Sequence, residues 1–129
     1  MTMMIGYGED FLTLWAVTER LNLILKQLGT STAPKDCLVI YRPSFGRAGL
    51  VGEFDAIIVT PKIAYLVESK WDKSKMPNDV LKLDNAQIRR HEMLRWYHEH
   101  WDGDIWGKFV EEHKAEFKNK FKRRIAPEG

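Results

Sequence analysis

Cysteine is almost missing from this chain, since Cys37 is the only one among 129 residues. A single cysteine cannot close a disulfide within the chain, so the sequence is typical of a reducing compartment, although pairing between two chains stays open. The simplest role for Cys37 is that of a small buried apolar side chain.

Long apolar segments are missing as well. No run approaches the roughly 20 apolar residues of a membrane-spanning helix, and the N-terminal segment MTMMIGYGEDF is acidic where a signal peptide is basic. The sequence therefore predicts a cytoplasmic protein that does not enter a membrane. It also lacks a Walker loop, a GxGxxG pattern and a Ser/His/Asp arrangement with a supporting motif, which argues against those classes of nucleotide-binding protein and hydrolase.

Neither sign of charge dominates, with 20 Lys and Arg against 18 Asp and Glu. Because 44% of the residues are hydrophobic, the chain is not disordered, and its length predicts one domain over residues 1–129. The charge is uneven, since residues 114–124 hold six basic residues and one acidic residue. Such a block either follows the phosphates of a nucleic acid or forms a solvated helix face. Its candidate phosphate ligands are Lys118, Lys122, Arg123 and Arg124.

The N-terminal part of the chain predicts one helix and three strands. Apolar residues recur at helical spacing over residues 9–28. Branched and aromatic residues predict antiparallel strands over 36–41, 52–60 and 63–70, and Pro61-Lys62 is the tight turn between the last two strands.

Two amphipathic helices are expected over 79–101 and 105–122. The apolar face of the first should comprise Val80, Leu83, Leu94, Tyr97 and Trp101. The apolar face of the second should comprise Trp106, Phe109, Val110, His113, Phe117 and Phe121. The order of elements is therefore α-β-β-β-α plus a C-terminal helix, which predicts an α/β fold.

No internal repeat or low-complexity segment is visible, and the Pro/Gly stretches have the length of loops rather than linkers. Residues 125–129 end the chain where another strand would cover the edge of a three-stranded sheet. Three interpretations stay open: a minimal domain, a domain that pairs with another chain, and a fragment trimmed at its C-terminus.

Three charged residues interrupt the last two predicted strands, which are otherwise apolar. Asp55 lies in the first of them, and Glu68 and Lys70 share one face of the second because strand residues alternate between faces. A two-residue turn would pair Thr60 with Ile63 and so place Asp55 opposite Glu68. Like charges across a strand pair are destabilising, and apolar neighbours add the cost of burial. We therefore expect a compensating cation.

A divalent metal ion suits this pair of carboxylates. Mg²⁺ takes oxygen ligands, commonly one or two carboxylates together with waters and substrate phosphates. Lys70 would then hold the attacking water or stabilise developing negative charge. The alternative is a structural salt-bridge cluster on an exposed sheet face, and the apolar neighbours of Asp55 and Glu68 argue against it.

An Asp in one strand and Glu-x-Lys in the next, between flanking helices, is the pattern of the PD-(D/E)XK nuclease superfamily. Over residues 9–101 the chain resembles this superfamily through Asp55, Glu68, Ser69 and Lys70. The resemblance implies a restriction-endonuclease-like core, in which helices flank a mixed central sheet. It also implies hydrolysis of DNA phosphodiester bonds with Mg²⁺ or Mn²⁺, with Asp55 and Glu68 as metal ligands.

Two groups within the superfamily are similar to this chain. The nuclease-related domain group is similar through DAIIVTPKIAYLVESKW and NAQIRRH, with Asn85, Gln87 and His91 offset from its spacing and no glycine in the turn. Archaeal Holliday junction resolvases are similar through TERL, RPS and the small residue between Glu and Lys. In place of the proline that gives the motif its name, the chain has Phe54.

The resemblance brings three further residues to the site. Ser69 would give its backbone carbonyl oxygen to the metal. Glu19, in the first helix, would complete the acidic cluster, and it has no basic neighbour at i±3 or i±4. Gln87 lies on the apolar stripe of the second helix and would touch the site. The alternative is structural: Glu19 as a partly exposed charge, and Gln87 as a hydrogen-bonded amide at the core edge.

DNA is the expected partner, with Arg42 and Arg47 near the active face as phosphate ligands or as plain solubilising residues. Trp96, Trp101 and Trp106 either stack on exposed bases or belong to a core or interface. The resemblance is compatible with a homodimer. Two other hypotheses stay open: a non-catalytic nucleic-acid-binding or assembly module on the same fold, and an interaction protein that docks through its aromatic last helix.

Overall fold

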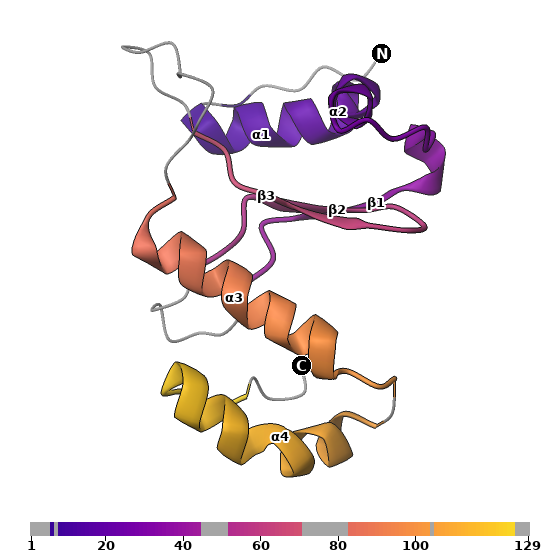
Figure 1. Ribbon diagram of the computed structural model, residues 1–129. Helices are drawn as coiled ribbons and strands as arrows, with labels where there is room; N and C mark the ends of the chain where they lie inside the picture. Colours follow the sequence, from indigo (N-terminus) through magenta and orange to yellow (C-terminus); the bar gives the residue numbers. More distant parts are fainter. Residues whose placement is uncertain (1–5, 7, 45–51, 71–82, 104, 126–129) are drawn as a thin grey trace. The chain divides into compact units, whose positions relative to one another are not determined.

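The computed structural model shows a mixed α/β protein with four α-helices and a three-stranded antiparallel sheet (Figure 1). It describes residues 6, 8–44, 52–70, 83–103 and 105–125. The chain divides into two compact units: Met1–Ser44 with Glu53–Asp84, and Phe45–Gly52 with Asn85–Gly129. The expectation of one domain over residues 1–129 stays a prediction.

The first unit begins with two short helices, α1 (Gly8–Glu19) and α2 (Leu21–Gln27). The single helix predicted over residues 9–28 is therefore broken, at Arg20, whose φ of −123° is not helical. In the last turn of α1 the Thr18 hydroxyl donates a hydrogen bond back to the Leu14 carbonyl oxygen (2.7 Å). Hydroxyls that bond the preceding turn often bend a helix, which accounts for the break.

The sheet follows a short 3₁₀ helix, η1 (Pro34–Asp36), and has the order β1-β2-β3. The strands are β1 (Leu38–Tyr41), β2 (Ala56–Val59) and β3 (Ala64–Val67). All pairs among these described strands are antiparallel, so the parallel strand that a mixed sheet requires is not among them. Each strand is shorter than predicted.

The β2–β3 hairpin has the predicted register. Ala56 pairs with Val67, and Thr60 pairs with Ile63 through a backbone hydrogen bond of 2.9 Å. The Thr60 hydroxyl donates to the Ile63 carbonyl oxygen (2.9 Å) and accepts from the Ile63 N–H (3.0 Å). Because a slip by one residue would turn every side chain to the other face, these bonds determine which residues meet at the far end of the hairpin.

One face of the sheet packs against α1 and α2 (Figure 1). Val17, Leu21 and Leu25 of the helices contact Ala56 and Ile58 of β2. This core holds the two helices on the sheet and so positions the first turn of α1 relative to the strand ends. Half-buried Cys37 packs against the same core, in agreement with its predicted apolar role.

The second unit contains α3 (Asn85–His100) and α4 (Trp106–Phe121). α3 begins six residues later than predicted, with Leu83 and Asp84 outside the helix. The aromatic core of the second unit contains Met93 and Trp96 of α3. From α4 and the residues that follow, the core contains Phe109, Phe117, Phe121 and Ile125.

The predicted apolar face of α4 is confirmed, whereas that of α3 is confirmed only in part, since Tyr97 packs against the core and Trp101 does not. The buried residues of α3 are Gln87, Arg90, Met93 and Trp96. Trp101, predicted on the buried stripe, is 43% exposed, and Val80 lies outside the described residues. The rings of Trp96 and Tyr97 both contact Phe117, at 5.0 Å and 5.3 Å between centroids, and of the two Trp96 is the more deeply buried, at 1% exposed.

None of the helices described here combines the length and the apolar character that crossing a membrane requires.

We expect Phe117→Ala to destabilise the protein by about 3–5 kcal/mol, because truncation of a fully buried Phe loses apolar burial and leaves a cavity. Urea denaturation followed by far-UV circular dichroism measures the effect. The matched control is Lys118→Ala, an exposed neighbour in the same helix, which should change stability by less than about 0.5 kcal/mol. Equal effects of the two substitutions would contradict the aromatic core.

Candidate active site

Asp55 lies just before β2, between the ends of the two neighbouring strands. Its backbone carbonyl oxygen accepts a hydrogen bond from the Arg42 N–H (3.1 Å), and its Oδ2 accepts one from the Ser69 N–H (2.5 Å). In the β2–β3 register Asp55 and Glu68 are the next residues after the last pair, Ala56 and Val67. The predicted neighbourhood of Asp55 with the Glu68-Ser69-Lys70 segment is therefore borne out, although these residues follow the strands rather than lie in them.

The residues at the end of the hairpin differ in their exposure to solvent. Asp55 and Glu68 are half-buried, whereas Lys70 is exposed. A half-buried carboxylate loses part of its hydration, so it favours hydrogen-bond donors or a cation nearby. For Asp55, the short bond from the Ser69 N–H supplies one such donor.

A cavity of about 310 Å³ adjoins this group within the first unit. Its lining residues come from one side of α1 and from the end of the hairpin: Glu9, Leu12, Thr13, Trp15, Ala16, Ser69 and Lys70. Thr13 joins the two sides, because its hydroxyl is hydrogen-bonded to the Ser69 hydroxyl (2.8 Å) and donates to the Glu9 carbonyl oxygen (3.0 Å). The start of α1 is thus tied directly to the residue between Glu68 and Lys70.

The first helix brings Glu9, not Glu19, to this cavity. Glu19 is exposed at the last residue of α1, about 15 Å along the helix axis from Glu9 at 1.5 Å per residue. Glu9 lies in the first turn, where unpaired N–H groups and the helix dipole favour a carboxylate. The acidic pair Glu9-Asp10 directly after Gly8 marks the start of a helix, and this signal in the sequence could have identified Glu9 as a candidate site residue.

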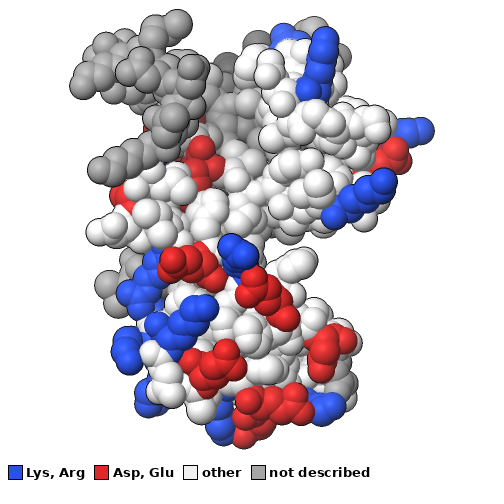
Figure 2. Space-filling model, viewed as in Figure 1, with Lys and Arg blue, Asp and Glu red and all other residues white. Residues whose placement is uncertain are grey.

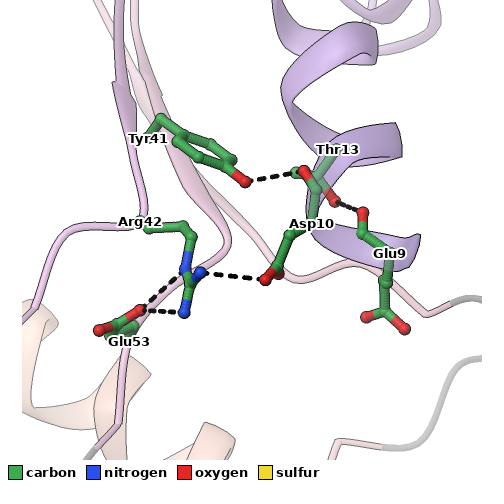
Figure 3. Close-up of polar contacts among 6 residues, drawn as sticks. All are labelled: Glu9, Asp10, Thr13, Tyr41, Arg42 and Glu53. Atoms are coloured by element: carbon green, nitrogen blue, oxygen red, sulfur yellow. Dashed lines mark hydrogen bonds and ion pairs between the residues drawn. The ribbon is translucent and has the colours of Figure 1, made fainter. Parts of the chain in front are cut away.

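Arg42 forms an ion-pair cluster with Asp10 and Glu53 (Figure 3). Its guanidinium contacts Asp10 Oδ2 at 3.0 Å and Glu53 Oε2 at 2.9 Å, and these two carboxylates raise its pKa above the usual value. The backbone of Arg42 is left-handed, with a φ of +48°. Because two carboxylates already balance its charge, the geometry does not favour the phosphate contact predicted for Arg42. The cluster instead ties the first turn of α1 to β1 and β2.

The pKa of Tyr41 responds to the charged groups in this region. Its hydroxyl donates to the Asp10 carbonyl oxygen at 2.7 Å (Figure 3). Burial raises the pKa of Tyr41, and the charges of Asp10 and Asp55 raise it further, while Arg42 acts in the opposite direction. The charge of Asp55 is therefore close enough to act on the phenol.

The remaining predicted site residues do not belong to the described part of the first unit. Gln87 is buried in α3, in the second unit, so its predicted contact with the site stays a prediction. Arg47 lies outside the described residues. The predicted phosphate ligands at the end of the chain also belong to the second unit: Lys118, Lys122 and Arg124 are exposed, and Arg123 is half-buried.

The surface of the second unit carries both signs of charge. In Figure 2 acidic side chains lie among the basic ones over this unit. Lys114 pairs with Glu111 at 2.5 Å, and Lys120 lines a surface hollow together with Glu92 and Glu99. The described part of the chain therefore presents, in this view, a mixed surface rather than a uniformly basic one.

The donor atoms at the hairpin end suit one kind of metal ion. Asp55, Glu68 and the Ser69 carbonyl oxygen are hard oxygen donors, and Mg²⁺ commonly uses one or two carboxylates with waters. Within the described ranges, no group of three or more His, Cys, Asp or Glu residues could hold a metal ion. Two carboxylates and a carbonyl oxygen are the ligand types of an open, water-rich Mg²⁺ or Mn²⁺ site rather than those of a closed four-ligand zinc site.

A scan against protein-family models, a search of curated proteins and a search of solved structures find no match to this chain. Any statement on its function therefore depends on the residues and contacts described above.

We expect Tyr41 to ionise at higher pH in the folded protein than in the unfolded chain. Because the pKa is raised in the folded state, the protonated Tyr41 hydroxyl contributes to the stability of the fold below about pH 10. This contribution is lost as the pH rises through the folded-state pKa. Asp10→Asn should lower the Tyr41 pKa, because it removes a nearby negative charge. Titration of phenolate absorbance measures the shift, with Tyr41→Phe identifying the signal; an unchanged titration in Asp10→Asn would contradict the assigned cause.

Proposed function

We propose that this chain is a metal-dependent nuclease that hydrolyses DNA phosphodiester bonds, on a restriction-endonuclease-like core. The observation that carries the proposal is the meeting of Asp55 with the Glu68-Ser69-Lys70 segment, through the β2–β3 register and the bond from the Ser69 N–H. The antiparallel sheet flanked by α1 and α2 is compatible with such a core. Two half-buried carboxylates beside an exposed lysine are suited to a reaction that develops negative charge on phosphate oxygens.

Each residue of the group has a distinct role in this proposal. Asp55, Glu68 and the Ser69 carbonyl oxygen would hold Mg²⁺ or Mn²⁺, which when bound neutralises phosphate charge and makes water a better nucleophile. Lys70 is exposed and lines the cavity, so its ammonium can orient a water by hydrogen bonding and balance charge on the phosphate. Glu9 lines the same cavity and takes the place predicted for Glu19, where its carboxylate can accept a hydrogen bond from that water.

A non-catalytic nucleic-acid-binding module is the second candidate. The observation that favours it is that Asp55 Oδ2 already accepts a hydrogen bond from the Ser69 N–H (2.5 Å), so this carboxylate has a partner within the protein. In that case the short bond from Ser69 to Asp55 would serve only to close the end of the hairpin. Such a module would bind DNA equally well with a chelator present, and its affinity would fall steeply with salt.

Lys70→Ala should lower the cleavage rate by about 100-fold or more, because it removes a cation placed where negative charge develops. Folding and DNA affinity should change little, since Lys70 is exposed and would contribute only one cation to the binding of DNA. The measurement is cleavage of labelled single-stranded, duplex and branched DNA with Mg²⁺ or Mn²⁺. The matched control is Lys62→Ala, an exposed lysine in the turn at the other end of the same hairpin, which should cleave at the wild-type rate.

Cleavage by Lys70→Ala at the wild-type rate would make the assigned role of Lys70 wrong. Calorimetric titration of Mg²⁺ and Mn²⁺ into wild type and into Asp55→Ala/Glu68→Ala tests the metal ligands separately. If wild type binds neither ion, cleaves no DNA and still binds DNA in chelator, the binding module replaces the nuclease.

A further inference from the structure

The wall of the cavity next to Lys70 is mostly apolar, although charged groups stand at its edges. Leu12, Trp15 and Ala16 of α1 line it, and the Trp15 side chain is 38% exposed, so a large aromatic ring is open to solvent beside the candidate active site. The hydrolytic proposal uses Asp55, Glu68, the Ser69 carbonyl oxygen, Lys70 and Glu9, and gives Trp15 no role. The aromatic ring at this cavity is therefore unexplained by the chemistry.

Trp15 is also held by a cation. The guanidinium carbon of Arg20 lies 5.2 Å from the centroid of the Trp15 ring, within the range of a cation–π contact. This contact restricts the ring and places a positive charge beside it. Lys70 lines the cavity itself, together with the carboxylate of Glu9, so the apolar wall has one cation and one anion on its lining and a further cation on the Trp15 ring.

An aromatic ring with cations beside it is complementary to a nucleotide, which joins a flat base to a negatively charged phosphate. The Ser69 hydroxyl oxygen, whose proton bonds Thr13, can still accept a hydrogen bond from a base edge. The cavity volume of about 310 Å³ is at the low end of pockets that hold small ligands, which suits one base rather than a larger group. A paired base inside a duplex has both faces covered by its neighbours, so only an unpaired base can offer a face to Trp15.

We propose that this cavity binds one unpaired base of a DNA strand, stacked on Trp15, and that the substrate is therefore single-stranded or frayed DNA rather than intact duplex. This inference rests on the proposed nuclease function for the link to cleavage. Lys70, which lines the cavity, contacts a phosphate that flanks the base. The stacked base would position its neighbouring phosphodiester at the Asp55-Glu68 pair.

Binding is tested with the full chain in chelator, so that no cleavage occurs, by fluorescence anisotropy of two labelled single strands of equal length. One is an oligothymidylate and the other has the same phosphates without bases. Wild type should bind the thymidylate about 10-fold more tightly, the size expected for stacking one base. Trp15→Ala should reduce this ratio to about 1, while Trp15→Phe, which keeps a ring, should retain most of it.

The matched control is Trp101→Ala, because Trp101 is similarly exposed, at 43%, but lies in the second unit. It should leave the ratio unchanged, and circular dichroism verifies that all variants fold. A wild-type ratio near 1, or an unchanged ratio in Trp15→Ala, would overturn the stacking site.

Cleavage with Mn²⁺ separates this inference from the proposed function. Trp15→Ala should lose single-strand cleavage by about 10-fold with little effect on any residual duplex cleavage, whereas Lys70→Ala should lose both. Cleavage that Lys70→Ala abolishes and Trp15→Ala leaves intact would refute the stacking site and support the nuclease. A base-dependent binding ratio that requires Trp15, in a wild type that cleaves no DNA, would support the stacking site and refute the nuclease.

Discussion

The antiparallel pairing of β2 with β3 is the constraint on which the candidate site depends. Neither Asp55 nor Glu68 lies within a strand. Each is next in sequence to a residue of the last strand pair, Ala56 and Val67, and this pairing determines its position. The Thr60 hydroxyl, bonded to both backbone groups of Ile63, keeps the register at the closed end of the hairpin. At the open end, the bond from the Ser69 N–H to Asp55 extends the contact past the last ladder pair.

Electrostatics around the first turn of α1 adds a second constraint. Asp10, Glu53 and Asp55 meet near Arg42, and the raised pKa of Tyr41 has burial, Asp10 and Asp55 among its causes. The guanidinium of Arg42 is paired with Asp10 and Glu53, not with Asp55. Asp55 is hydrogen-bonded by a neutral backbone N–H instead, and this difference is the physical basis for expecting a metal ion at Asp55 rather than at the Arg42 cluster.

Aromatic residues serve different purposes in the two units. Trp96 is 1% exposed, stacks on the His100 ring at 4.2 Å and packs against the aromatic residues of α4, so it belongs to a core. Trp15 has a guanidinium as its ring neighbour and lines a cavity. Tryptophan content therefore does not by itself indicate nucleic-acid binding in this chain; the surroundings of each ring decide whether it can stack on a base.

The sequence by itself determined the order of the three strands and of the two helices that follow them, the hairpin register and the apolar face of α4. These follow from local rules: the period of side chains along a strand or helix, and a two-residue turn. Tertiary structure alone decided that Glu9 rather than Glu19 reaches the cavity, that Arg42 is paired with two carboxylates, and that α3 buries Trp96 instead of Trp101. Each of these outcomes depends on which helix face meets a partner and where along the helix it does so, and periodicity within one segment carries no information on that choice.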